Sequence, residues 1–158
     1  GEDTLSLHDA LPICCPYIQE NCDVDIPSDN LIIYGHNMRV KSMFGSLHDF
    51  ESEDFYKKHN KIYLYQPGKT IKCTIYSVYD CLDKSATYNT DFSDDGNDNK
   101  WVDWLTMTVN NNAYYPIKKK PAEKDHIITL STCSGKQKGD SYRFVVHSLV
   151  TDTVIYEE

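Results

Sequence analysis

The sequence has few basic residues and no long apolar run. Lysine and arginine number 16 against 24 aspartates and glutamates, which gives a formal net charge of −8. Nucleic-acid binding needs a basic face that neutralises phosphates, so the composition argues against that class of protein. The one basic run, Lys118–Lys120, is predicted to lie on a solvated loop. No apolar run reaches the ~18 residues that span a bilayer, and no secretion signal is recognised.

The cysteines show neither a CxxC pair nor the His/Cys spacing of a zinc site. They are Cys14, Cys15, Cys22, Cys73, Cys81 and Cys133. We therefore predict no metal and no cofactor. Cys73 and Cys81 are spaced so that they could pair across a hairpin, and they fit equally well as small buried hydrophobic residues. The sequence leaves that disulfide open.

The chain is long enough for one domain and rich in tyrosine. It has 158 residues, of which 40% are hydrophobic, with 12 tyrosines against 5 phenylalanines. Tyrosine suits half-buried strand faces and groove walls, because its ring packs while its hydroxyl stays hydrated. Residues 1–13 resemble the translation of a common sequencing adapter, and we predict a non-native leader there. Residues 14–27 are predicted to be irregular, and residues 28–158 to form the domain.

The local patterns predict mostly strands, with helices inserted singly between them. Ser52 is a predicted N-cap, and a further helix with Trp101 and Trp104 on its apolar face begins near Asn99. Pro67 and Gly68 form the turn of a predicted hairpin. The predicted strands are 31–34, 61–65, 70–79, 127–132, 142–150 and a short one at 153–156, and a first helical patch is predicted at 42–47. This order favours an all-β barrel or sandwich, without internal repeats.

Cys133 ends a predicted strand between small polar residues, and Arg143 opens the next strand ten residues later. A nearby cation favours the thiolate, which is the nucleophilic form of cysteine. A buried structural cysteine and a surface arginine remain the alternatives from these residues alone.

Six histidines compete for the role of acid or base. His36 ends a predicted strand. His147 shares a strand face with Arg143 and could approach the thiol, although a core or surface histidine is the preferred interpretation. The others are predicted in the leader (His8), exposed on helices (His48, His59) and at the far start of the Cys133 strand (His126).

Three segments resemble the signature segments of class B sortases. They are Tyr34–Met38 (YGHNM), Thr129–Cys133 (TLSTC) and Arg143–His147 (RFVVH). The order His, Cys, Arg and the Cys-to-Arg spacing also resemble that family, and the similarity covers residues 28–150. It implies a mainly β fold, a closed sortase-type β-barrel with inserted helices. Family members have a membrane anchor and further strands before the first signature segment, so the first strands are expected to be missing here.

The resemblance also implies an activity and a site. It is that of a cysteine transpeptidase, which cleaves a C-terminal sorting signal after threonine and transfers the acyl group to a cell-wall or pilin amine. Cys133 would be the nucleophile, His36 the acid and Arg143 the oxyanion or substrate-holding group. Ser131, Thr132, Tyr142 and Tyr34 are weaker candidates for lining the substrate pocket. The native protein would be anchored at the outer face of the membrane.

Two other classes remain possible from the sequence. One is a cysteine hydrolase that releases its product without transfer. The other is a non-catalytic β-domain that binds a partner through its tyrosine-rich surface, with Cys133 buried. A sortase that is inactive as this fragment is a third outcome, because an unpaired sheet edge would be exposed.

Overall fold

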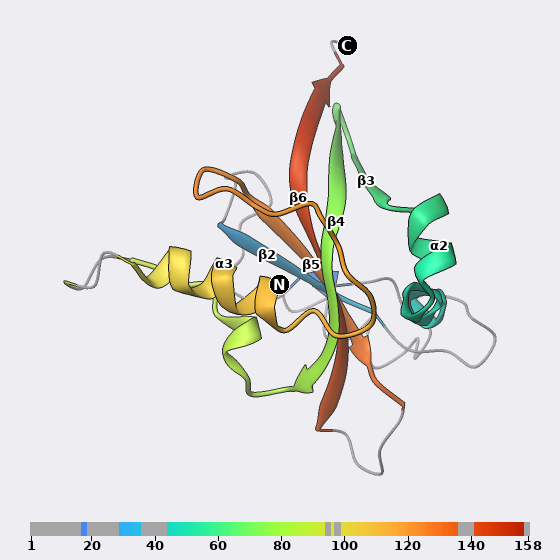
Figure 1. Cartoon of the computed structure of the whole chain (residues 1–158). Helices are drawn as coiled ribbons and strands as arrows, with labels where there is room; N and C mark the ends of the chain where they lie inside the picture. Colours follow the sequence, from blue (N-terminus) through green and yellow to red (C-terminus); the bar gives the residue numbers. More distant parts are fainter. Residues whose placement is uncertain are drawn as a thin grey trace, which may run out of the picture.

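The computed structural model describes residues 17–18, 29–35, 44–93, 96, 99–135 and 141–156. These residues form one sheet with helices packed against it (Figure 1). The elements are β1 (Tyr17–Ile18), β2 (Asn30–Tyr34), η1 (Phe44–Glu51), α2 (Glu53–Lys58), β3 (Lys61–Gln66), β4 (Lys69–Leu82), η2 (Ala86–Tyr88), α3 (Lys100–Asn110), β5 (Ile127–Cys133) and β6 (Tyr142–Ile155). The predicted leader and His36 lie outside the described residues.

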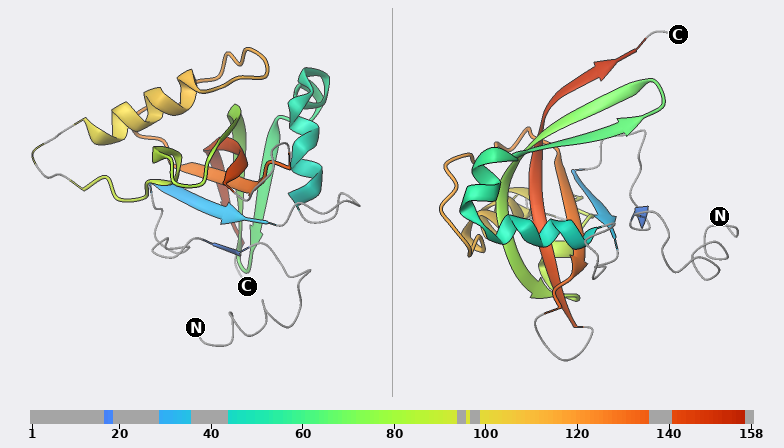
Figure 2. Two further views of the ribbon diagram at one scale, coloured as in Figure 1. Left: turned by 90° about the horizontal axis from the view of Figure 1, so that it is seen from below. Right: turned by 90° about the vertical axis from the view of Figure 1, so that its right-hand side faces the viewer.

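The sheet has six strands in the order β1-β2-β5-β6-β4-β3. Strands β2 and β5 run parallel, and every other neighbouring pair is antiparallel. The hairpin of β3 and β4 turns at Pro67 and Gly68, as predicted. Gly68 has a φ of 78°. Strands β4 and β6 pair along most of their length and extend beyond the helices (Figure 2). The fold is therefore mainly β with inserted helices.

Strand β6 is longer than predicted. The sequence indicates two strands, 142–150 and 153–156, whereas the structure has one strand from Tyr142 to Ile155. The register with β4 shifts between Lys72 and Cys73, which pair with Asp152 and Val150, so Thr151 is an extra residue on β6. Its hydroxyl donates to the Lys72 carbonyl at 3.1 Å. This β-bulge lets the strand continue through a polar stretch that looks like an end in the sequence.

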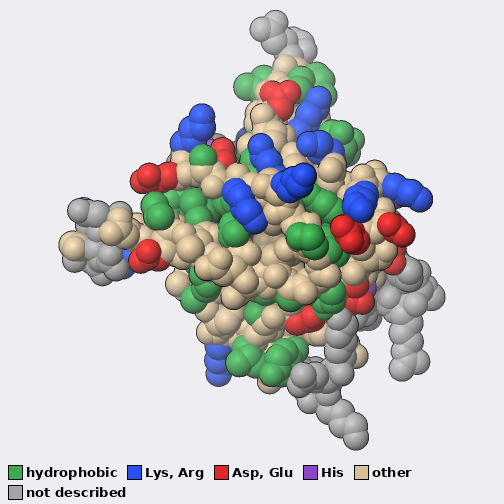
Figure 3. Space-filling model, in the orientation of Figure 1, with side chains coloured by type: hydrophobic (Ala, Val, Ile, Leu, Met, Phe, Trp, Pro, Cys, Tyr) green, Lys and Arg blue, Asp and Glu red, His purple; other side chains and the backbone are tan. Residues whose placement is uncertain are grey.

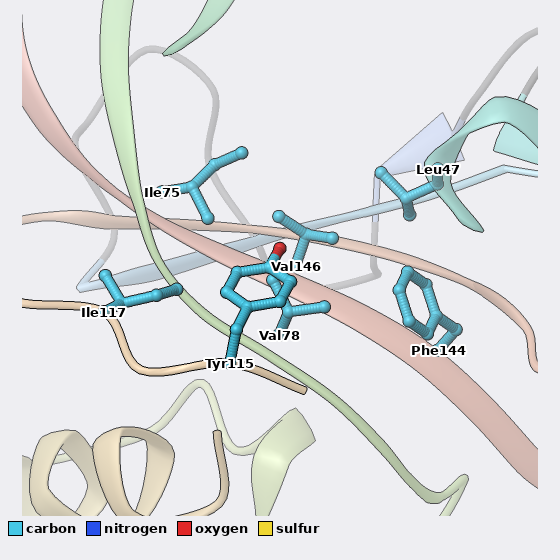
Figure 4. Close-up of a cluster of buried hydrophobic side chains, with 7 residues drawn as sticks. All are labelled: Leu47, Ile75, Val78, Tyr115, Ile117, Phe144 and Val146. Carbon is cyan, nitrogen blue, oxygen red and sulfur yellow. The ribbon is translucent and has the colours of Figure 1, made fainter. Parts of the chain in front are cut away.

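The helices cover the two faces of the sheet. Helices η1 and α2 lie on one side and α3 on the other (Figure 1). On the η1 side, Leu47 packs with Val78, Phe144 and Val146 from β4 and β6 (Figure 4). On the α3 side, Trp104 and neighbouring apolar residues form a second cluster. The expectation that the tryptophans pack in the core is confirmed for Trp104, which is 4% exposed.

Most helix ends agree with the sequence, and one helix does not. Ser52 caps α2 by accepting a hydrogen bond from the Phe55 N–H at 3.4 Å. Helix α3 begins at Lys100 as predicted. The patch predicted at 42–47 is instead the 3₁₀ helix η1, which runs to Glu51. Its Leu47 is buried against the sheet, and packing of this kind supplies most of the stability of short helices in proteins.

Cys73 and Cys81 do not pair. Both lie on β4, so eight residues of extended chain separate them by ~26 Å, far beyond disulfide reach. Both are free thiols. The possible pairing across a hairpin is wrong because the strand after the turn continues through both cysteines. The prediction that Lys118–Lys120 is solvated is confirmed, since all three are exposed. Figure 3 shows most of the basic side chains of this face over the upper half of the molecule, several of them close together near its centre.

Gly35 follows β2 and lies against the ring of Phe44. A Cβ atom at this position would sit well inside van der Waals contact with that ring. We expect Gly35→Ala to lower the free energy of unfolding by about 1–3 kcal/mol, because the ring must move in a packed environment. Chemical denaturation measures this, with exposed Ser46→Ala as the control. Phe44→Leu should recover part of the loss in the double variant. An unchanged denaturation midpoint for Gly35→Ala would refute the close approach.

Candidate active site

Cys133 and Arg143 lie directly opposite each other on neighbouring strands. Cys133 is the last residue of β5 and is exposed, while Arg143 is the second residue of β6 and half-buried. The two are register partners in the antiparallel pair. Directly opposed residues project from the same face, with Cβ atoms ~5 Å apart. The thiol and the guanidinium therefore share one face at the sheet end.

The backbone N–H that follows the thiol is already engaged. Ser134 donates it to the Tyr142 carbonyl at 3.1 Å, and Arg143 Nη1 donates to the same oxygen at 3.1 Å. In many acyl-transfer sites the N–H after the nucleophile stabilises the oxyanion. Here that N–H maintains the β5–β6 ladder, so Arg143 is the candidate donor beside the thiol.

His36 lies outside the described residues, so the structure does not test its role. The last described residue before it, Gly35, donates its N–H to the Ser131 carbonyl at 3.0 Å. Ser131 is two residues before Cys133 on β5. The parallel pairing of β2 and β5 therefore brings the chain that leads to His36 beside the strand that carries the thiol.

Tyr34 and Ser131 are brought together by a residue that the sequence did not indicate. The Tyr88 hydroxyl is 2.8 Å from Ser131 Oγ, and its ring stacks on Tyr34 with centroids 5.9 Å apart. Tyr88 ends the short helix η2, inside the polar and acidic stretch 83–100. No local sequence pattern identifies Tyr88 as a site residue, because its contacts depend on the positions of β2 and β5 in the sheet.

Thr132 and Tyr142 do not join the face of the thiol. Alternation along β5 sends the Thr132 side chain to the opposite face, where it is 2% exposed and pairs with Phe144. Alternation likewise points the Tyr142 side chain away from the Arg143 face. Tyr142 contributes its carbonyl instead, as the acceptor for Arg143 and Ser134.

A pocket of about 610 Å³ opens beside Tyr88, between the η2 loop and α3. Its volume lies in the usual range of ligand sites. It is lined by Ala86, Tyr88, Asn89, Thr90, Asp91, Phe92, Lys100, Asp103, Trp104 and Met107. Because Tyr88 also contacts Ser131, the pocket adjoins the strand that ends at Cys133.

The structure confirms the preferred interpretation of His147 as a core histidine and changes the position of His48. His147 is fully buried and does not reach the thiol; burial lowers its pKa to about 3. His48, predicted as an exposed helix residue, is half-buried, and its Nε2 lies 3.0 Å from the Cys133 carbonyl oxygen. The i,i+3 spacing of His48 and Glu51 was the one sequence signal that could have marked this side chain. His59 is exposed, as predicted.

Within the described part of the chain, no group of three or more His, Cys, Asp or Glu side chains is arranged to hold a metal ion. The same residues contain no helix that is long and apolar enough to cross a membrane. The described site offers a thiol, a guanidinium and nearby hydroxyl groups.

Fold and site together define a mainly β domain with an exposed thiol set against an arginine on the neighbouring strand. The family model described as "Sortase domain" matches residues 23–150, so the chain belongs to the sortase family. This agrees with the signature segments found in the sequence.

Characterised relatives narrow the similarity to sortase B. The chain is 34% identical over 124 residues to sortase B of Listeria monocytogenes, covering 77% of this chain and 48% of the relative. It is 29% identical over 119 residues to sortase B of Staphylococcus aureus, covering 74% and 46%. The chain thus spans about half the length of these relatives.

Solved structures of sortase B have the same fold. A Staphylococcus aureus sortase B–substrate complex matches with a TM-score of 0.76 at 26% identity, over 87% of this chain and 62% of that one. Clostridium perfringens sortase B matches with a TM-score of 0.75 at 26% identity, over 87% and 73%.

Proposed function

We propose that this chain carries the catalytic centre of a class B sortase, a cysteine transpeptidase. The observation that carries the proposal is the exposed Cys133 directly across the ladder from Arg143. The family match and the similarity to sortase B support it. A solved relative is a sortase B–substrate complex, which supports a sorting-signal peptide as the substrate of this chain as well.

The chemistry divides one amide exchange into two steps. The Cys133 thiolate attacks the carbonyl carbon of a Thr–X amide, and Arg143 stabilises the oxyanion of the tetrahedral intermediate. The C–N bond breaks as protonated His36 gives its proton to the leaving amine. A thioester of Cys133 remains. An acceptor amine then attacks the thioester carbonyl, its proton passes to His36, and the Cys133 thiolate leaves.

The tyrosines and the pocket provide the substrate-binding surface in this proposal. Tyr34 and Tyr88 stack beside Ser131, next to the thiol strand, and the pocket between η2 and α3 continues from Tyr88. A peptide bound along the pocket and the two tyrosines would place its scissile amide between Cys133 and Arg143. The acceptor is an amine of a cell-wall peptide precursor or a pilin lysine. The native protein then acts at the outer face of the membrane.

The product distribution tests the proposal. We expect sorting-type peptides to give a transfer product in the presence of an amine acceptor, and only slow hydrolysis without it. A panel of fluorogenic peptides followed by mass spectrometry measures both products, with the N-acetylated acceptor as the matched control. Equal hydrolysis with and without the acceptor, and no transfer product, would identify a cysteine hydrolase instead.

The binding-only alternative depended on a buried Cys133. The structure has Cys133 exposed, which removes that premise. Alkylation of Cys133 by a soft reagent at neutral pH separates the two functions in solution, because an unreactive thiol in the folded protein contradicts the enzyme proposal.

A further inference from the structure

A set of polar side chains lies behind Cys133, on the face of the sheet opposite to its thiol. His48 Nε2 lies 3.0 Å from the Cys133 carbonyl oxygen. Its other ring nitrogen, Nδ1, lies 3.5 Å from Glu51 Oε1. The His48 ring also stacks on Phe144, with centroids 4.6 Å apart. Helix η1 therefore contacts the backbone at the residue that carries the thiol.

A second set of hydrogen bonds reaches Ser134, the residue after Cys133. Ser134 Oγ donates to Asp80 Oδ1 at 2.7 Å, and Asp80 Oδ2 accepts a hydrogen bond from the Tyr114 hydroxyl. The Tyr114 hydroxyl also lies 3.4 Å from Glu51 Oε1, the same atom that lies near His48 Nδ1. These contacts thus form one continuous series of polar groups, with the Cys133 carbonyl at one end and the Ser134 side chain at the other.

These residues come from separate elements of the chain. His48 and Glu51 lie on η1, Asp80 lies on β4, Tyr114 follows α3, and Ser134 follows β5. We call His48, Glu51, Tyr114, Asp80 and Ser134 the Cys133 clasp. Strand alternation puts the Cys133 side chain on the opposite face, and the clasp contacts the carbonyl of Cys133 and includes the side chain of Ser134.

We propose that the Cys133 clasp is a positioning device for the nucleophile, with His48 as its central donor. This inference rests on the proposed transpeptidase function. Cys133 is the last residue of β5, and the ends of strands open more readily than their interiors. The clasp fixes the peptide plane from which the thiol projects. Misplacing a reacting atom by ~1 Å can cost a rate factor of ~100, so the orientation of this plane affects turnover.

The test compares two substitutions of His48. His48→Phe keeps a ring on Phe144 and removes the donor, whereas the Gln amide of His48→Gln can donate to the Cys133 carbonyl. We expect His48→Phe to lower kcat about 10- to 100-fold with KM within about 3-fold, and His48→Gln to stay within about 3-fold of the parent in both. The exposed His59→Gln is the matched control. Ser134→Ala removes the hydrogen bond to Asp80, and it should also lower kcat.

A second readout does not depend on activity. The Ser134 amide, which donates to Tyr142, should exchange with solvent about 10-fold faster in His48→Phe and at the parental rate in His48→Gln. Nuclear magnetic resonance measures this residue by residue. If the parent gives no transfer product, the proposed function fails and the exchange rates still decide whether the clasp holds the strand end. Parental kcat or parental exchange in His48→Phe would overturn the inference. If His48→Phe does not fold, the same criteria apply to Ser134→Ala.

Discussion

Cys133→Ala is expected to abolish both hydrolysis and transfer, by about four orders of magnitude or more, because no other described thiol can form the thioester. The covalent peptide adduct should disappear from the mass spectrum at the same time. Cys81→Ala is the matched control, and we expect it to retain most of the activity.

The choice of control follows from the geometry of Arg143. On one side Arg143 pairs with Cys133 of β5, and on the other side it pairs with Cys81 of β4. The two cysteines therefore flank Arg143 on the neighbouring strands. Cys81 is half-buried, and burial raises the pKa of its thiol, which keeps it protonated. Cys133 is exposed, so solvent and substrate can reach it.

Native-state alkylation distinguishes the thiols without any substrate. We expect rapid labelling of Cys133, and slow labelling of Cys81 and of Cys73, whose pKa burial raises to about 11. Peptide mapping by mass spectrometry assigns the label to each residue. Activity that survives in Cys133→Ala and is lost in Cys81→Ala would reverse the assignment of the nucleophile.

Acidification is expected to destabilise the fold through His147. We predict that the free energy of unfolding falls by about 2 kcal/mol more between pH 7.5 and pH 5 in the parent than in His147→Gln. At pH values near 3 the difference should reach about 4 kcal/mol. This follows from a native pKa of about 3 against an ordinary value of 6.5.

The cause is a buried, neutral imidazole in a hydrogen-bonded chain. Thr129 Oγ1 donates to Asn30 Oδ1 at 2.7 Å, so it accepts from His147 Nδ1, also at 2.7 Å. His147 Nε2 is then the acceptor for the Tyr79 hydroxyl at 2.8 Å. The chain joins β4, β6, β5 and β2, the four central strands of the sheet.

The direction of this pH dependence follows from the protonation of His147 in the unfolded and in the native state. Between pH 6.5 and about pH 3 the unfolded chain binds a proton at His147 and the native state does not. The stability that His147 contributes is therefore fully present above pH 6.5 and is lost as the pH falls toward 3. Urea denaturation at several pH values measures the slope, with His59→Gln as the control for an exposed histidine. A slope in His147→Gln equal to that of the parent would refute this assignment.

Much of the fold could be predicted because its signals are local. Ser52 at a helix start, Pro67–Gly68 between alternating runs, and the tryptophan face of α3 each act through neighbouring residues. The break predicted within β6 was wrong because a bulge at Thr151 depends on the register with β4. No pattern within β6 alone contains that register.

The sequence by itself determined which segments carry chemistry and their order along the chain. It placed a thiol at one strand end and an arginine on the next strand, because strand length and alternation are short-range properties. Only the tertiary structure decided what surrounds them. It set Cys81 on the other side of Arg143, Tyr88 on Ser131, and His48 behind Cys133. Such contacts depend on strand order and register across the whole sheet, where a slip of one residue would move every side chain to the other face.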